Sequence, residues 1–337
     1  MSMNQGRTKA FERNAVLEGL LEELNEQLAE VEDRTVEGRA DTDLPQVMII
    51  GAPRSGTTLM LQWLAATGSF SYPTNLLSRF YRAPSIGAKI QEILTNPKLA
   101  HGDELEGLGT RSAFTSDLGK TRGPLAPHEF WYFWRRFLPT EEIEPMGARA
   151  EDADWKGLRG ALASVSAVFG RPLAMKGMMM QYDLGRAARE LPRALFLHVH
   201  RDPLSNSLSL LRARESFFGD RARWYSAKPP EHGSLVDSAP PVQVAGQVHW
   251  TNVHIERGLR EVPEDRQISV SYEAFCADTS LVWERLREQL GHLGHGLATE
   301  HDAPASFSST NSRPQDASDA EAITSALNEF ALNTPSQ

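Results

Sequence analysis

The stretch VMIIGAPRSGTTLM, residues 47–60, decides the fold class of this chain. Its apolar start, Val47 to Ile50, runs directly into a glycine and a loop, which predicts a short buried strand. Beyond the loop, Thr57 to Ala66 has the composition of a helix. A strand, a glycine-containing loop and a helix together direct backbone N–H groups and the positive helix end at one point. This arrangement predicts an anion-binding site.

The loop keeps the glycine spacing of a nucleotide-binding P-loop but lacks its lysine. Gly51 and the glycine five positions later match G-x-x-x-x-G-K-[ST], yet Thr57 stands where the lysine would reach the β- and γ-phosphates. Arg54 supplies a fixed positive charge, and Ser55, Thr57 and Thr58 supply hydroxyl donors. Such a site suits a phosphate-containing ligand that does not transfer a metal-bound terminal phosphoryl group.

Three further short apolar stretches predict strands, and stretches with helical spacing lie between them. The predicted strands are residues 173–179, 194–201 and 267–275, and a helix is predicted at 281–293. This alternation predicts an α/β fold with a P-loop-like central parallel β-sheet flanked by helices on both faces. Residues 68–170 and 212–247, rich in Gly, Pro and aromatic residues, are expected to form helical and loop insertions.

We expect a main domain at residues 46–300 between two smaller segments. Residues 1–45 are an N-terminal helix and linker, with the helix at 8–32. Its leucines recur at steps of three and four residues, so it either packs on the main domain or forms a homodimer contact. Residues 301–337 are expected to be a polar, partly flexible C-terminal tail.

The composition excludes several classes of protein. A net charge of −9 over 337 residues argues against a nucleic-acid-binding protein. The single cysteine, Cys276, rules out an internal disulfide framework and suits a reducing compartment. The polar N-terminus lacks the apolar core of a signal peptide, and no stretch is long enough for stable membrane insertion, so we expect a cytoplasmic protein. No histidines lie at a convincing metal-ligand spacing, and no metal site is predicted.

A second polar group of residues follows the third predicted strand, in HVHRDPLSNSLSLLRAR at 198–214. Arg201 ends the strand, Pro203 can begin a helix, and Ser209 follows Arg201 by eight residues. In such a helix Ser205 and Ser209 share one face, so Arg201 and these serines can converge on a second phosphate. An R-D-P sequence on its own is also an ordinary helix start.

The two groups of residues together resemble the sulfotransferase family that uses 3′-phosphoadenosine 5′-phosphosulfate, PAPS. In that family PRSGTT is the loop for the 5′-phosphosulfate, and the R-D-x-x-x-x-x-x-S element binds the 3′-phosphate. The resemblance covers residues 46–280, with both motifs complete and in the expected order. It implies a sulfotransferase with PAPS as co-substrate and 3′-phosphoadenosine 5′-phosphate, PAP, as product.

The resemblance also implies roles for individual residues. Arg54 would contact the 5′-phosphosulfate bridge, and the following four residues would cradle the 5′-phosphate. Tyr272 in SYEAF would lie near the adenine, although it can also be a packing residue at a strand end. The implied donor-binding residues are Arg54, Ser55, Gly56, Thr57, Thr58, Arg201, Ser209, Tyr272 and, from a C-terminal loop, Arg313.

Lys176 is the catalytic residue that the resemblance implies between the two motifs, since many members have a strand-end lysine on the transferring sulfonyl group. The general base is less certain, because Met178 stands where cytosolic members with K-T-H have histidine. The candidates are His128 and Glu129 in LAPHEFWYFWRRF. In the structural alternative, His128 caps a helix and Glu129 pairs with one of the two arginines of that segment.

The acceptor is expected to be a hydroxyl of a small molecule, glycolipid or carbohydrate. Residues 130–137 and 178–180 suggest an apolar acceptor, although both can be ordinary core. An anionic or sugar-like acceptor could instead be received by arginines 111, 122, 135 and 136. Two other functions remain open: a P-loop kinase or NTPase, and a non-catalytic nucleotide-binding scaffold.

Overall fold

Four parallel strands form the centre of the molecule in the computed structural model, which describes residues 6–36, 44–99, 114, 116–311 and 317–334. The strands are β1 (Gln46–Ile50), β2 (Leu173–Lys176), β3 (Ala194–His200) and β4 (Gln267–Ser271), in the order β2-β1-β3-β4. The predicted α/β class is confirmed, and each predicted strand is present. The second ends at Lys176 and not at residue 179, because Met178 begins a 3-10 helix. The fourth ends at Ser271, because Tyr272 begins a helix.

Strand β1 is apolar on both faces because helices cover both faces of the sheet. Val47 and Ile49 of β1 pack on one side of the sheet, and Met48 and Ile50 pack on the other. This alternation of fully buried residues explains why β1 appears in the sequence as a continuous apolar run.

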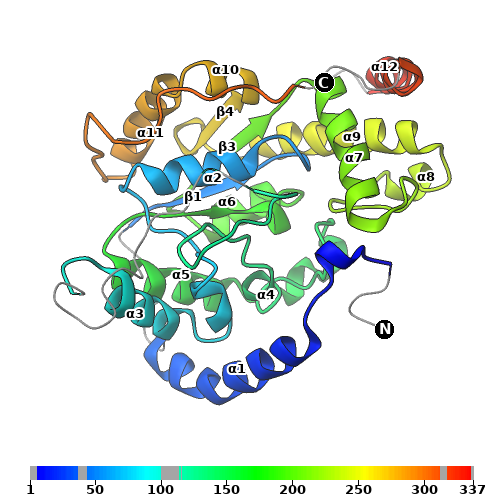
Figure 1. The fold of residues 1–337 in the computed structure, drawn as a ribbon. Coiled ribbons are helices and arrows are strands. Elements are labelled where there is room, and N and C mark those ends of the chain that lie inside the picture. Colours follow the sequence, from blue (N-terminus) through cyan, green and yellow to red (C-terminus); the bar gives the residue numbers. More distant parts are fainter. Residues whose placement is uncertain (1–5, 37–43, 100–113, 115, 312–316, 335–337) are drawn as a thin grey trace.

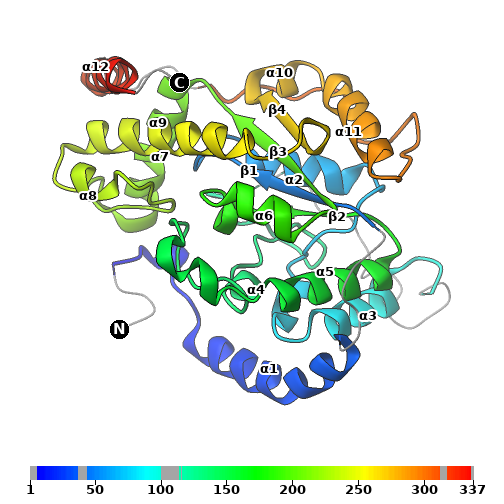
Figure 2. The same cartoon turned by 180° about the vertical axis from the view of Figure 1, so that it is seen from behind.

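Helices lie in layers above and below the sheet (Figures 1 and 2). One face carries α2 (Thr57–Ala66), α10 (Tyr272–Ala277) and α11 (Ser280–His292). The other carries α5 (Trp155–Phe169), α6 (Leu184–Glu190) and the C-terminal part of α9 (Pro240–Leu259), with α3 (Pro84–Thr95) and α4 (Trp131–Trp134) further out. The short 3-10 helices are η1 (Lys9–Phe11), η2 (Leu77–Phe80), η3 (Gly147–Asp152), η4 (Met178–Met180) and η5 (Glu264–Arg266).

A third group of helices lies beside the sheet. It contains α7 (Pro203–Phe218), α8 (His232–Leu235) and α12 (Ala317–Asn333), and α12 packs across α7 and α9. Ile323 and Ala326 of α12 are buried against apolar residues of those two helices. The polar composition of residues 301–337 did not predict this packed helix.

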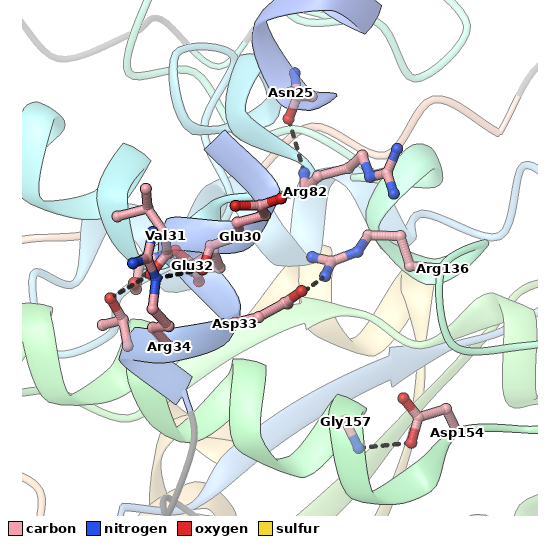
Figure 3. A network of polar contacts seen from close by, with 12 residues as sticks. Asn25, Glu30, Val31, Glu32, Asp33, Arg34, Arg82, Arg136, Asp154 and Gly157 are labelled. Atoms are coloured by element: carbon pink, nitrogen blue, oxygen red, sulfur yellow. Dashed lines mark hydrogen bonds and ion pairs between the residues drawn. The ribbon is translucent and has the colours of Figure 1, made fainter. Parts of the chain in front are cut away.

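Helix α1 (Ala15–Val36) lies along the outside of α3 and α5 (Figure 1). Its buried residues are polar: Asn25 accepts the Arg82 N–H at 2.8 Å, and Glu32 accepts the Ser85 N–H at 2.9 Å. Figure 3 shows Asn25 beside Arg82, and it also shows Asp33 beside Arg136, at 4.0 Å. The leucines of α1, which were predicted to pack on the main domain, are half-buried or exposed. The fully buried contacts are made by Asn25 and Glu32 instead.

Among the described residues, no helix combines the length and apolar character that crossing a bilayer requires.

Candidate active site

At two positions of the loop after β1, the backbone conformation and the close contacts leave room only for glycine. A Cβ on Gly51 would lie 2.4 Å from the Val199 carbonyl oxygen, so the loop packs directly on the end of β3. Gly56 has φ +105°, and a Cβ there would lie 2.5 Å from the Tyr272 ring. Arg54, between them, also has a positive φ, of 69°. When successive residues alternate between right-handed and left-handed backbone conformations, their N–H groups point to the same side, as in anion-binding loops.

The inner side of this loop holds polar groups that are not satisfied by the protein. The Ser55 hydroxyl is completely buried and finds no hydrogen-bond partner in the described part of the chain. Gly56 occupies the N-cap of α2 and offers no capping side chain, so the first N–H groups of α2 lack a side-chain acceptor there. Buried donors of this kind fit an anionic ligand.

The second motif forms the start of α7, as the sequence predicts. Pro203 is its first residue, and the Asp202 carboxylate accepts the Ser205 N–H at 2.7 Å. Arg201 lies between this cap and the carboxyl end of β3.

The structure brings the two motifs together. Arg201 Nη1 donates to the Arg54 carbonyl oxygen at 3.1 Å, and Arg54 Nε donates to Ser209 Oγ at 3.4 Å. Asn206 Nδ2 also donates to the Pro53 carbonyl oxygen at 2.6 Å. Because β1 and β3 are neighbouring parallel strands, the segments that follow them meet at the same sheet edge.

Tyr272 joins the two motifs through its ring. One edge lies against Gly56, and the Arg201 guanidinium lies 4.5 Å from the ring centroid. The phenol oxygen accepts the Thr310 N–H at 3.1 Å and lies 2.9 Å from Thr310 Oγ1. Tyr272 therefore connects the loop, Arg201 and the C-terminal segment.

The C-terminal segment reaches the Arg201 side chain through residues that the sequence did not single out. Arg201 Nε donates to Asn311 Oδ1 at 2.8 Å, and Nη2 donates to the Thr310 carbonyl oxygen at 3.0 Å. Asn311 in turn donates to Glu273 at 2.8 Å. Arg313, the residue predicted from this segment, lies outside the described residues and stays a prediction. The polar sequence STN just before Arg313 was the only available signal for these contacts.

Lys176 lies at the end of β2 and connects the loop helix to the candidate base. Its Nζ donates to Thr58 Oγ1 and to Glu129 Oε1, both at 2.7 Å, and its side chain is only 3% exposed. The other carboxylate oxygen of Glu129 accepts the Trp131 indole N–H at 2.6 Å. Glu129 thus pairs with Lys176, and not with the arginines of its own segment.

The ionised form of Glu129 is favoured by these contacts. Burial by itself would raise the pKa of Glu129, but the Lys176 charge and the two hydrogen bonds outweigh it and lower the pKa below its ordinary 4.5. The carboxylate is therefore negatively charged at neutral pH and able to accept a proton.

His128 lies beside Glu129 in a different environment. Burial lowers the pKa of His128 to about 4, although the Glu129 charge opposes this effect. His128 Nδ1 accepts the Phe130 N–H at 2.9 Å. A neutral imidazole that accepts at Nδ1 carries its proton on Nε2, which leaves no free lone pair on that nitrogen.

A tight turn at residues 117–120 lies on the group formed by Lys176, Glu129 and Thr58. A Cβ on Gly119 would lie 3.1 Å from Glu129 Oε1 and 3.6 Å from Thr58 Oγ1. Tyr225 donates to the Leu118 carbonyl oxygen at 3.3 Å and holds this turn from the far side. Burial and then the Glu129 charge raise the pKa of Tyr225 to about 12. No pattern in the sequence indicated this turn.

Of the other residues suggested for the acceptor, Arg111 lies outside the described residues and Arg122 is exposed. Four of the eight residues 130–137, and all three methionines of η4, are buried in the hydrophobic core, which favours the core interpretation of both. Arg135 pairs with Glu141 at 3.4 Å, and Arg136 faces α1. No group of three or more potential metal ligands is found within the described residues.

Comparisons with known proteins identify the family and the fold. The model of the sulfotransferase family matches residues 45–292, which is most of the chain. The fold is similar to that of sulfotransferase STF9 from Mycobacterium avium, with a TM-score of 0.51 and 15% identity over 93% of this chain and 73% of that chain. Sulfotransferase STF1 from Mycobacterium tuberculosis H37Rv gives 0.48 and 13% over 89% and 75% of the two chains. A sulfotransferase from Alicyclobacillus acidocaldarius gives 0.41 and 15% over 85% and 92%. None of the curated proteins searched matches this chain. By the family match over residues 45–292, the chain belongs to the sulfotransferase family.

Proposed function

We propose that this transferase uses PAPS as its sulfate donor and transfers the sulfuryl group to a hydroxyl of a small-molecule, glycolipid or carbohydrate acceptor. Membership of the sulfotransferase family implies a sulfate donor and an acceptor, but the family match does not identify either molecule. One observation carries the choice of donor: Arg201 and Ser209 of the second motif both hydrogen-bond to Arg54 of the loop. Two anion sites this close fit a nucleotide with phosphates at both its 5′ and 3′ positions.

The 5′-phosphate would bind in the loop between β1 and α2. The unsatisfied Ser55 hydroxyl, the backbone turned by Arg54 and Gly56, and the N-terminus of α2 all offer donors to one anion. Thr57 and Thr58 would add hydroxyl donors. We propose that Arg54 contacts the bridge between the phosphate and the sulfate.

The 3′-phosphate would bind to Arg201 and Ser209. At present the Arg201 guanidinium donates to neutral acceptors, an amide oxygen of Asn311 and two carbonyl oxygens. Phosphate oxygens form stronger, charge-assisted hydrogen bonds with arginine than neutral acceptors do. Tyr272, whose ring contacts both motifs, would then lie beside the adenine.

Lys176 would stabilise charge on the sulfonyl group during transfer. An ammonium group has three N–H donors, and Glu129 and Thr58 use two of them. The third remains for an oxygen of the sulfonyl group or of the departing phosphate, where negative charge develops.

Glu129 is the general base that the geometry favours over His128. Its carboxylate is ionised and contacts Lys176 directly, so a proton acceptor lies beside the proposed sulfonyl position. His128 accepts the Phe130 N–H at Nδ1 and carries its proton on Nε2, so neither ring nitrogen has a free lone pair to take a proton from the acceptor.

Calorimetry with PAP and adenosine 5′-phosphate tests the donor. We expect PAP to bind about 100-fold more tightly, because a 3′-phosphate adds charge-assisted hydrogen bonds of about 1.5–3 kcal/mol each. Arg201→Ala should remove this preference. Arg266→Ala is a matched control: Arg266 also donates to two carbonyl oxygens, at 3.1 and 3.0 Å, but precedes β4 at the opposite sheet edge. Equal affinity of the wild-type protein for both nucleotides would refute the proposed donor.

A further inference from the structure

The turn at residues 117–120 places a lysine next to the proposed catalytic group. Asp117 and Lys120 exchange two backbone hydrogen bonds of 2.8 Å, which fixes the turn. Gly119 lies against Glu129, and Lys120 is the next residue in the chain. The backbone of Lys120 is therefore one residue away from the contact with Glu129, and its ammonium group lies at the Phe11 ring.

An N-terminal arm, residues 6–11, reaches the same turn from the other end of the chain. Thr8 forms two hydrogen bonds of 2.9 Å to the end of α7, from its N–H to the Phe217 carbonyl oxygen and from its hydroxyl to the Ser216 carbonyl oxygen. Phe11 is 3% exposed and packs on Phe217 with ring centroids 4.7 Å apart. In Figure 1 this arm (dark blue) rises from α1 toward α7 and α8. These contacts bring Arg7 of the arm to the turn.

Arg7 and Lys120 both lie on the aromatic pair. The Lys120 ammonium is 4.7 Å from the Phe11 ring centroid and 6.0 Å from the Phe217 centroid. The Arg7 guanidinium is 5.3 Å from the Phe217 centroid. Within the described ranges, no carboxylate lies within ion-pair distance of either cation. Burial, followed by repulsion from a neighbouring cation, lowers the pKa of both groups.

The positive charges in this region exceed the negative ones. Arg13 pairs with Glu18 at 3.7 Å, and the Asp117 charge partly offsets that of Lys120 without forming an ion pair. The Glu18 charge acts on Arg7 in the same way, but Arg13 and Arg223 add positive charges near it. Arg7 is half-buried and Lys120 is exposed. Cations that repel one another are unfavourable by themselves, and an anionic ligand would compensate them.

We propose that the acceptor is a hydroxyl compound that also carries an anionic group, either a carboxylate or a phosphate, and that Lys120 and Arg7 bind this group. The inference rests on the proposed function. The acceptor would extend from Glu129, which receives the hydroxyl proton, along the turn to the cations. Its oxygen forms the new bond to sulfur while the bond from sulfur to the bridging oxygen of PAPS breaks, and PAP leaves with that electron pair.

The test compares matched acceptors in the presence of PAPS. The panel contains hydroxyaryl carboxylates of increasing chain length, each beside its methyl ester, and hexose phosphates, each beside the free hexose. We expect kcat/KM to favour the anionic member of at least one pair by about tenfold to a hundredfold, as is usual for a charge-assisted hydrogen bond. The reactive series identifies the anion as a carboxylate or a phosphate.

Variants connect the preference to these two residues. Lys120→Met and Arg7→Met should each remove most of it, and Lys120→Arg should restore part of it. Lys9→Met is the control, because Lys9 is an exposed lysine of the same arm. PAP affinity, measured separately, should be the same in all of them.

The outcomes separate the two proposals. If PAP fails to bind the wild-type protein, the proposed function itself is refuted. If PAP binds but the neutral acceptors react as well as the anionic ones, or no anionic compound reacts at all, the acceptor inference is overturned. An anionic preference that survives Lys120→Met and Arg7→Met also overturns it.

Discussion

Replacing Glu129 by glutamine tests the ion pair at the centre of the proposed site. The two carboxylate oxygens of Glu129 accept hydrogen bonds from Lys176 and Trp131, at 2.7 and 2.6 Å. Glutamine has the same shape but only one acceptor oxygen, so one of these two donors would face an NH₂ group. Since Lys176 is almost completely buried, its charge would also lose its partner.

The expected loss follows from these contacts. A hydrogen bond to a charged group contributes about 1.5–3 kcal/mol, and glutamine keeps one of the two bonds, so the free energy of unfolding at pH 7 should fall by about 2 kcal/mol. For a chain of 337 residues the unfolding entropy is about 0.7 kcal/mol/K, and the melting temperature should therefore fall by about 3 °C. Urea unfolding and calorimetry measure both quantities.

The dependence on pH adds a second test. The pKa of Glu129 is lower in the folded protein than its ordinary 4.5, so the unfolded chain takes up the proton first as the pH falls. The stabilisation by Glu129 is complete above about pH 4.5 and is lost as the pH falls through the folded pKa. The difference between wild type and Glu129→Gln should therefore narrow in that range.

A surface ion pair provides the control for this variant. Glu141 pairs with Arg135 at 3.4 Å, but its side chain is 83% exposed. Glu141→Gln should change the stability by less than about 0.5 kcal/mol, because water screens exposed pairs. If Glu129→Gln behaves like Glu141→Gln from pH 7 down to pH 4, the reasoning about the buried pair is wrong.

Three other substitutions give distinct results. Gly56→Ala should lower the free energy of unfolding by about 2–3 kcal/mol and weaken PAP binding, because a φ of +105° and the Tyr272 ring 2.5 Å away exclude a Cβ. In urea unfolding, Gly19→Ala should show no such loss of stability, because nothing lies within 4 Å of a Cβ there. Lys176→Met should lower turnover about 100-fold or more while changing PAP affinity little, because PAP lacks the sulfonyl group; steady-state kinetics and calorimetry would show equal losses if the lysine only shaped the site. His128→Gln should lower turnover far less than Glu129→Gln. With a folded pKa of about 4 against 6.5 unfolded, His128 makes the protein lose stability as the pH falls from 6.5 to 4, and unfolding experiments should find a shallower loss in the variant.

Much of the framework could be predicted from local sequence, because periodicity and glycine spacing act over short distances. The predicted helix at residues 57–66 has the same bounds as α2, and β1 differs by one residue from the apolar run that predicted it. The meeting of Arg54 and Arg201 follows from a general property of parallel sheets, since both residues come directly after neighbouring strands. These predictions needed no knowledge of long-range contacts.

Contacts made by irregular segments could not be predicted in this way. Glu129 and Lys176 were each recognised as candidates, but their ion pair joins residues 47 positions apart in a loop and a strand. The arm at residues 6–11 and the turn at 117–120 have no periodic pattern, so nothing in the sequence indicated that they meet. For α1 the leucine pattern indicated packing on the main domain, as observed, but it did not indicate that Asn25 and Glu32 make the fully buried contacts.

The donor motifs are also less independent than their separation in the sequence suggests. The ring of Tyr272 excludes any side chain at Gly56, lies under the Arg201 guanidinium and binds Thr310 through its hydroxyl. A shift of this ring would therefore disturb the 5′ loop, the 3′ arginine and the C-terminal segment at once. Motif spacing suggests which residues would bind each phosphate of the proposed donor, but packing around Tyr272, a residue outside both motifs, positions those residues relative to one another. The two short motifs are consequently sufficient to propose a donor site and insufficient to determine its geometry.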